Sequence, residues 1–196
     1  MMRIVFAVWL VTVALLSSAA SRVPEANALY GKDVTTKHLG GQFEMTDQNG
    51  KKRQLSEFRG KVVLVFFGYT RCPDVCPTTL SRMSQVVSLL GPQALNIQVL
   101  WVTVDPDRDS PEILRNYVPA FNPAFIALRG SAKETYAIAR KFNVGYTILA
   151  YQGSILVDHS AEGYLIDTNG KTRVKLPYDM TAEQIAADIR KYLPHD

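Results

Sequence analysis

The residues of this chain best suited to chemistry are its two cysteines, Cys72 and Cys76, which are separated by three residues. They follow a continuous apolar run at 62–68, which is short and rich in β-branched residues and therefore typical of a buried strand. Pro77 comes directly after the second cysteine and suits the first turn of a helix, where its missing N–H costs nothing. The pair is thus expected at a strand-to-helix turn, where the positive end of the helix favours a thiolate over a thiol.

Two thiols at this spacing allow several kinds of chemistry. Thiolates about one helical turn apart can bind one soft ion, such as Cu(I) or zinc. The same pair could instead reduce the disulfides of other proteins, reduce peroxide, or form a structural disulfide. A disulfide across so small a loop gains little chain entropy, so stability alone is a poor reason for it. The spacing leaves metal transfer and thiol–disulfide exchange as the main alternatives.

The patterns on either side of the cysteines predict alternating strands and helices. Asn-Gly pairs predict one hairpin at 43–58 and another at 164–176. Apolar runs predict further strands at 97–104 and 125–128. Amphipathic helices are predicted at 77–90, 110–121, 131–142 and 181–193, the last three opened by a Ser or Thr N-cap. This order predicts the α/β class: a thioredoxin-like sandwich with an N-terminal β-hairpin and an inserted strand/helix segment.

A histidine would complete a Cys₂His ligand set, which suits copper in both oxidation states. His38 lies in the expected N-terminal arm and His195 is next to last in the chain, so we expect both to be solvated. His159 lies between a strand-like segment at 154–157 and the next predicted strand. In a thioredoxin-like fold the loop entering that strand faces the cysteines, which makes His159 the candidate third ligand.

Three separated motifs resemble the Sco/SenC family, thioredoxin-like copper chaperones of cytochrome c oxidase assembly. The motifs are GYTRCPDVCP at 68–77, VDPDRDSP at 104–111 and VDHS at 157–160, and the resemblance covers residues 39–193. It implies that Cys72, Cys76 and His159 bind copper and that Asp105 orients the site from behind the ligands. The other interpretation of Asp105 is that it only caps the turn before Pro106. This chain has an arginine before the first cysteine, where many relatives have histidine.

The resemblance implies a metal carrier rather than an enzyme. Copper, as Cu(I) or Cu(II), would pass by ligand exchange to the dinuclear copper site of the oxidase subunit. The cysteine pair would alternate between disulfide and dithiol, so a thiol reductant protein is an expected second partner. The alternative function is that of a thiol:disulfide oxidoreductase that reduces cysteines of the oxidase subunit, for which His159 would be dispensable.

The N-terminus indicates export from the cytoplasm. Arg3 is followed by an apolar segment at 4–16 and small residues at 17–21, the pattern of a secretory signal peptide or of a short uncleaved anchor. We therefore divide the chain into a signal peptide or anchor at 1–21, a linker or arm at 22–40 and a copper-binding domain at 41–194. The expected location is the bacterial periplasm or the periplasmic face of the inner membrane, with membrane association through residues 1–20. The net charge of +4 is scattered, which argues against nucleic acid as a partner.

Overall fold

The computed structural model describes residues 28–151, 154–159 and 161–194. Its main sheet contains the strands β1 (Lys32–Asp33), β2 (Glu44–Asp47), β3 (Lys52–Gln54), β4 (Val62–Gly68), β5 (Ile97–Thr103), β6 (Ile126–Arg129), β9 (Gly163–Ile166) and β10 (Thr172–Leu176). The helices are α1 (Val75–Leu90), α2 (Pro111–Tyr117), α3 (Ala132–Lys141) and α4 (Ala182–Arg190), with short 3₁₀ turns at Thr35–Lys37, Leu55–Phe58 and Gly91–Asn96. A separate two-stranded sheet is formed by β7 (Tyr146–Tyr151) and β8 (Ser154–His159).

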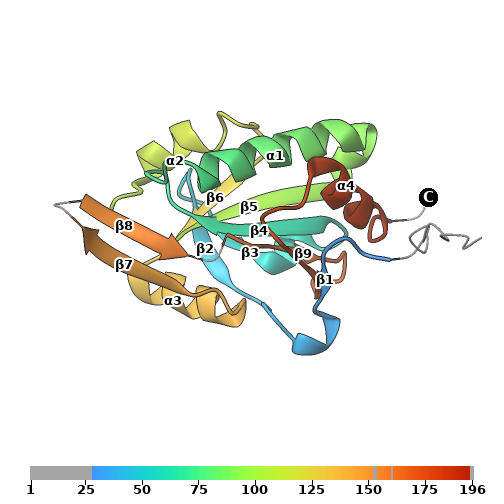
Figure 1. Ribbon diagram of the computed structural model, residues 1–196, viewed down its shortest axis with the longest axis horizontal. Coiled ribbons are helices and arrows are strands. Elements are labelled where there is room, and N and C mark those ends of the chain that lie inside the picture. Colours follow the sequence, from blue (N-terminus) through green and yellow to red (C-terminus); the bar gives the residue numbers. More distant parts are fainter. Residues whose placement is uncertain (1–27, 152–153, 160, 195–196) are drawn as a thin grey trace, which may run out of the picture.

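The main sheet is mixed, with strand order β1-β10-β9-β4-β5-β6-β2-β3 (Figure 1). Strands β4, β5 and β6 run parallel, whereas β9 pairs antiparallel with β4, and β2 pairs antiparallel with β6. Every residue of β4 is buried, as the continuous apolar run predicts. This arrangement confirms the predicted α/β class and places the end of β4 at the centre of one sheet edge.

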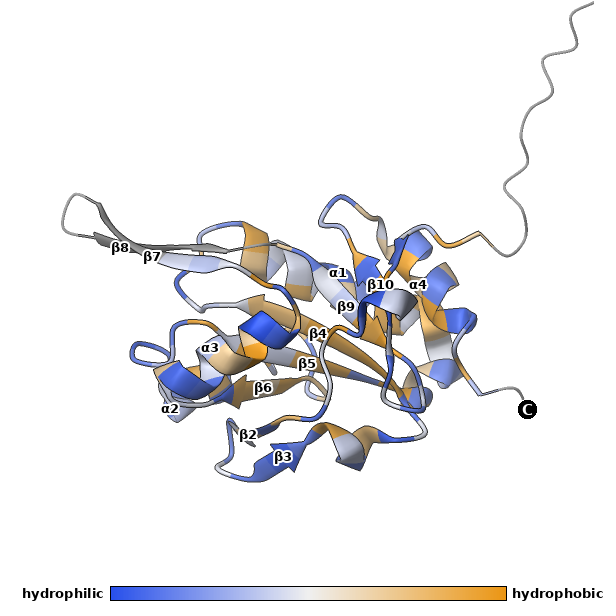
Figure 2. Cartoon of the chain, turned by 90° about the horizontal axis from the view of Figure 1, so that it is seen from below, coloured by the Kyte–Doolittle hydropathy of each residue, from blue (hydrophilic) through white to orange (hydrophobic). Residues whose placement is uncertain are grey.

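Helices cover both faces of this sheet, and each face has its own apolar core. Helices α1, α2 and α4 pack on one face, against side chains such as Leu64 and Trp101. Helix α3 packs on the other face, where Val63, Val65 and Phe142 belong to the second cluster. Figure 2 shows the apolar strands of the sheet enclosed between these helices. Alternate residues of β4 therefore point into different cores, as strand geometry requires.

The predicted helix starts are confirmed by their capping contacts. The side chains of Ser110, Ser131 and Thr181 each accept a hydrogen bond at 3.3 Å from the backbone N–H three residues later. Three helices differ from the prediction in length. Helix α1 begins at Val75, two residues earlier than predicted, α2 ends at Tyr117 rather than near 121, and α4 ends at Arg190 rather than near 193. The early end of α2 has a physical cause, because Pro119 lacks the N–H that would continue the helix.

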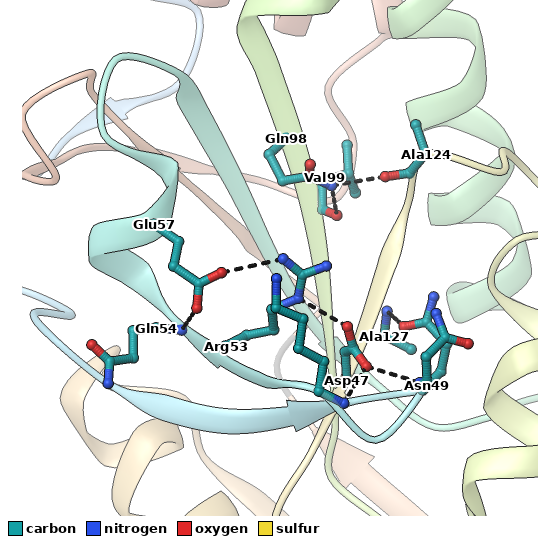
Figure 3. A network of polar contacts seen from close by, with 11 residues as sticks. Asp47, Asn49, Arg53, Gln54, Glu57, Gln98, Val99, Ala124 and Ala127 are labelled. Atoms are coloured by element: carbon teal, nitrogen blue, oxygen red, sulfur yellow. Dashed lines mark hydrogen bonds and ion pairs between the residues drawn. The ribbon is translucent and has the colours of Figure 1, made fainter.

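The first predicted hairpin is confirmed as β2 and β3, and its turn is organised by one carboxylate (Figure 3). Asp47 Oδ1 accepts hydrogen bonds from the N–H groups of Asn49 and Lys51, both at 2.9 Å, while Oδ2 accepts one from Arg53 Nε at 2.8 Å. Gly50 has φ +84°, a conformation that glycine adopts without strain. The Asn-Gly signal thus specifies the turn together with the aspartate before it.

The second predicted hairpin, β9 and β10, repeats this turn in detail. Asp167 Oδ1 accepts from the N–H groups of Asn169 and Lys171 at 2.9 Å, and Oδ2 accepts from Arg173 Nε at 2.6 Å. Both turns therefore use the pattern Asp-x-Asn-Gly-Lys-x-Arg. The two hairpins lie on opposite sides of the parallel strands that carry the cysteine loop.

The packed part of the chain begins earlier than the linker predicted at 22–40 allows. Strand β1 pairs with β10, and Val34 is buried. The fully buried Asp188 of α4 accepts hydrogen bonds from the N–H groups of Tyr30 and Gly31, at 3.0 and 2.8 Å. A two-residue strand of charged side chains shows no periodicity, which is why the sequence patterns miss it. The signal peptide or anchor predicted at 1–21 lies outside the described residues. Among the residues that are described, no helix is long and apolar enough to cross a bilayer.

Candidate metal centre

The two cysteines lie at the connection between β4 and α1. Cys72 is half-buried in the connecting loop, and Cys76 is buried in the first turn of the helix. The Cys76 backbone N–H donates a hydrogen bond to Cys72 Sγ at an N–S distance of 3.4 Å. No disulfide joins the two cysteines. The structure therefore brings the two predicted sulfur ligands to one place at the edge of the sheet.

Gly68, the last residue of β4, makes room for the buried sulfur. A Cβ atom at this position would lie 2.8 Å from Cys76 Sγ and 2.8 Å from Trp101 Nε1, closer than such atoms approach each other. Only glycine leaves both neighbours undisturbed. The sequence motif contains this glycine, but its role as the floor of the sulfur site becomes visible only when β4, β5 and α1 are packed together.

The electrostatics of Cys76 correct the expectation that the helix start favours its thiolate. Burial raises the pKa of the Cys76 thiol well above its ordinary value, and a hydrogen bond with the backbone of Tyr69 opposes this only in part. Negative charge on Cys72 raises the pKa further. Desolvation of the buried sulfur is the largest cause of this shift, because removal from water disfavours the charged thiolate. A bound cation would supply the positive charge that this thiolate lacks.

Asp109, which the sequence analysis did not single out as a site residue, holds the cysteine loop in place. The Asp109 carboxylate is fully buried and accepts hydrogen bonds from Thr70 N at 3.2 Å, Thr70 Oγ1 at 2.5 Å and Thr103 Oγ1 at 2.5 Å. Burial raises the pKa of Asp109, although the bonds from Thr103 and Thr70 oppose the rise. Asp109 thus fixes the loop two residues before Cys72 to the end of β5. Its position after a parallel strand neighbouring β4 is the signal that could have found it.

Asp105 lies at the same sheet edge, and its observed contacts are those of a residue that closes a turn. Its backbone carbonyl accepts hydrogen bonds from the N–H groups of Arg108 and Asp109, at 3.2 and 3.0 Å. Its buried carboxylate pairs with Arg108 Nε at 2.5 Å. Its own N–H donates to Thr103 Oγ1 at 3.0 Å, which links it to the Asp109 contacts. A role in orienting metal ligands remains a prediction.

His159 is the last residue of β8, where its backbone is paired with Tyr146 of β7. Figure 1 shows this hairpin extending beyond the sheet at the end where α1 begins. The His159 side chain is not among those described. Of the other histidines, His38 is exposed as predicted, and His195 lies outside the described residues. Within the part of the chain that the structure describes, no three His, Cys, Asp or Glu side chains form a group that could hold a metal.

The fold and the site together define a thioredoxin-like thiol protein, with a cysteine pair between a central parallel strand and the next helix. Residues 31–194 match the family model described as SCO1/SenC. A SCO2-like protein of Rickettsia prowazekii is 37% identical over 150 residues, which cover 75% of this chain and 73% of that protein. This chain belongs to the SCO1/SenC family.

Solved structures agree with this assignment. Copper-bound ScoI of Bradyrhizobium japonicum is 37% identical, with a TM-score of 0.73 over 79% of this chain and 99% of that one. BsSco, a member of the Sco family of cytochrome c oxidase assembly proteins in which a disulfide switch was identified, is 25% identical, with a TM-score of 0.64 over 79% of this chain and 93% of its own. Copper binding and a disulfide switch therefore both occur among the structures that this chain resembles.

Proposed function

We propose that this protein is a copper chaperone, which carries the ion on Cys72, Cys76 and His159 and delivers it to the dinuclear copper site of cytochrome c oxidase. The observation that supports this most directly is the 3.4 Å contact between the Cys76 N–H and Cys72 Sγ, which holds two soft donors side by side. Copper is the cargo in this proposal, and the protein performs no turnover.

The different exposure of the two sulfurs suits a carrier. Cys72 is half-buried and open to ligand exchange with a recipient, whereas Cys76 is buried against Gly68. Because burial raises the pKa of the Cys76 thiol, copper must displace its proton on binding, and protons compete with the metal as the pH falls. An imidazole from His159 would add a neutral nitrogen donor, which makes the set compatible with both Cu(I) and Cu(II).

The proposed function also depends on the compartment in which the protein works. The leader predicted at 1–21 places it in the bacterial periplasm or at the periplasmic face of the inner membrane. Thiols are oxidised in that compartment, so a reductant protein would keep Cys72 and Cys76 ready for copper. Asp105 would orient the site through its contact with Thr103.

Thiol:disulfide exchange is the second candidate function, because two neighbouring thiols at a strand-to-helix turn and the disulfide switch of BsSco both favour it. The two functions differ in their need for His159. A reductase requires both cysteines and no imidazole, whereas a copper carrier of the proposed kind requires all three residues.

The test is the visible spectrum of the reduced full chain after addition of Cu(II) without air. We expect a stoichiometric thiolate-to-copper charge-transfer band that Cys72→Ala, Cys76→Ala and His159→Ala each abolish or alter. His38→Ala is the matched control, because it removes an exposed histidine far along the chain from the cysteines. If copper merely oxidises the pair and leaves, and His159→Ala behaves like the wild type, the chaperone proposal is wrong and the reductase is favoured.

A further inference from the structure

The hydroxyl of Tyr117, the last residue of α2, is buried and has no hydrogen-bond partner among the described residues. A buried tyrosine hydroxyl normally has such a partner, because leaving the donor unpaired away from water is costly. An unpartnered hydroxyl inside a folded protein therefore points to a group that becomes available at that position. The surroundings of Tyr117 indicate which group this is.

Tyr117 packs with the apolar cluster beneath α1 and α2, and Trp101 of that cluster borders the space that holds the buried sulfur, although Cys76 itself clusters with side chains of the other face. The Tyr117 ring packs against Trp101 of β5, with 5.9 Å between the ring centroids. The indole Nε1 of Trp101 and the Cys76 Sγ each lie 2.8 Å from the position of a Cβ on Gly68, so these two groups share the space above that glycine. Trp101 thus contacts Tyr117 and also borders the space that holds Cys76 Sγ.

The charges around the phenol place it near the cysteines. Burial raises the pKa of Tyr117, and the next contributions come from negative charge on Cys76 and then on Cys72, followed by Asp109. The phenol therefore stays protonated at neutral pH and keeps an O–H donor in the neighbourhood of the two sulfurs. A thiol sulfur is a weak acceptor, whereas a thiolate is a strong one.

We propose that Tyr117 is a positioning residue of the cysteine pair, whose hydroxyl donates a hydrogen bond to the Cys76 sulfur when that sulfur becomes a metal-bound thiolate. This inference rests on the proposed function of the pair. When a cation binds, the thiol protons leave to solvent. The Cys76 sulfur then carries negative charge and can accept a hydrogen bond from the Tyr117 hydroxyl. The bond stabilises the loaded state specifically, because burial keeps Cys76 a thiol in the unloaded state.

The test compares Tyr117→Phe with a matched control, Tyr164→Phe, in the reduced full chain. Tyr164 is fully buried, and its hydroxyl, like that of the half-buried Tyr117, lacks a partner in the described part of the chain, but burial and Glu162 raise its pKa, without a contribution from the cysteines. The first readout is the dissociation constant of Cd²⁺, a thiophilic cation without redox chemistry, measured by competition with a chelator. The second readout is the energy of the Cu(II) charge-transfer band.

We expect Tyr117→Phe to weaken Cd²⁺ binding about tenfold, equivalent to about 1.4 kcal/mol, and Tyr164→Phe to change it less than about twofold. Without the donor the thiolate is more electron-rich, so the Cu(II) band of Tyr117→Phe should move to lower energy. Thermal unfolding should show that Tyr117→Phe keeps its fold.

Equal Cd²⁺ constants in the wild type and both variants would overturn the role of Tyr117. The Cd²⁺ comparison also separates this inference from the proposed function. A wild-type chain that forms no charge-transfer band with Cu(II) would refute the copper chaperone, yet a Cd²⁺ constant weakened only in Tyr117→Phe would still support the hydrogen bond to the thiolate.

Discussion

Thr103→Val is expected to cost the protein a large part of its stability, although valine nearly matches threonine in shape. The fully buried Thr103 hydroxyl donates to Asp109 Oδ2 at 2.5 Å and accepts from Asp105 N at 3.0 Å. Valine offers neither contact. The substitution therefore deprives a buried carboxyl group of a donor and leaves a buried backbone N–H without an acceptor.

The size of the effect follows from these two losses. A hydrogen bond to a charged group contributes about 1.5–3 kcal/mol, and a buried donor left unpaired costs about 1–3 kcal/mol. Allowing for partial relaxation, we expect the free energy of unfolding to fall by about 3 kcal/mol. For a chain of this size, about 2–4 °C per kcal/mol translates this into a drop in Tm of about 10 °C.

The matched control is Thr135→Val, the same exchange at a second fully buried threonine. The Thr135 hydroxyl in α3 has no hydrogen-bond partner among the described residues, so its removal relieves a desolvated group. We expect this variant to be unchanged or more stable by up to about 1 kcal/mol. Urea unfolding followed by circular dichroism at pH 7 measures both. Similar losses in the two variants would show that the contacts between Thr103 and Asp109 do not hold the loop.

Three further predictions concern other parts of the fold. Gly68→Ala should lose about 1–3 kcal/mol of stability by overpacking and alter the copper spectrum, because the new Cβ would displace the buried sulfur. The control Gly145→Ala should change neither stability nor spectrum, because a Cβ added there meets nothing within 4 Å. Burial raises the pKa of Asp47, but hydrogen bonds from Arg53 and from backbone N–H groups lower this pKa by more, so that it lies below its ordinary value. The ionised Asp47 side chain therefore stabilises the fold at neutral pH, and this stabilisation is lost as the pH falls below about 4. Asp47→Asn should therefore reduce the urea midpoint at pH 7 and flatten its decline between pH 5 and 3, and an unchanged acid limb would contradict this. Asp188→Ala should speed hydrogen exchange at the amides of 30–31 at least tenfold, while exchange within β4 stays slow.

Local patterns predicted most of the fold because the contacts behind them are local. The Asn-Gly turns are closed by an aspartate within the same turn, and the caps at Ser131 and Thr181 bond to residues three positions away. The buried strand 62–68 needs only its apolar run to be recognised. The cysteine pair belongs with these features, since Cys72 and Cys76 are close in sequence and in space.

The parts that escaped prediction depend on contacts between distant segments. The bond from Thr70 to Asp109 joins residues 39 positions apart. Both lie within the motifs at 68–77 and 104–111, but no local pattern reveals that they contact each other. The same holds for Tyr117, whose ring contacts Trp101 only because α2 packs against β5. The raised pKa of Cys76 also comes from tertiary burial, which the helix start alone does not reveal.

The contact between Asp109 and Thr70 joins residues that are synthesised at different times. The loop that carries Cys72 is held by a carboxylate that is synthesised 37 residues after that cysteine. A chain still emerging from the ribosome therefore has both thiols before it has the residue that fixes their loop. The loop acquires its native attachment only when β4 and β5 have paired and Asp109 has bonded to Thr70 and Thr103, so a fixed cysteine loop is a property of molecules whose central sheet is complete.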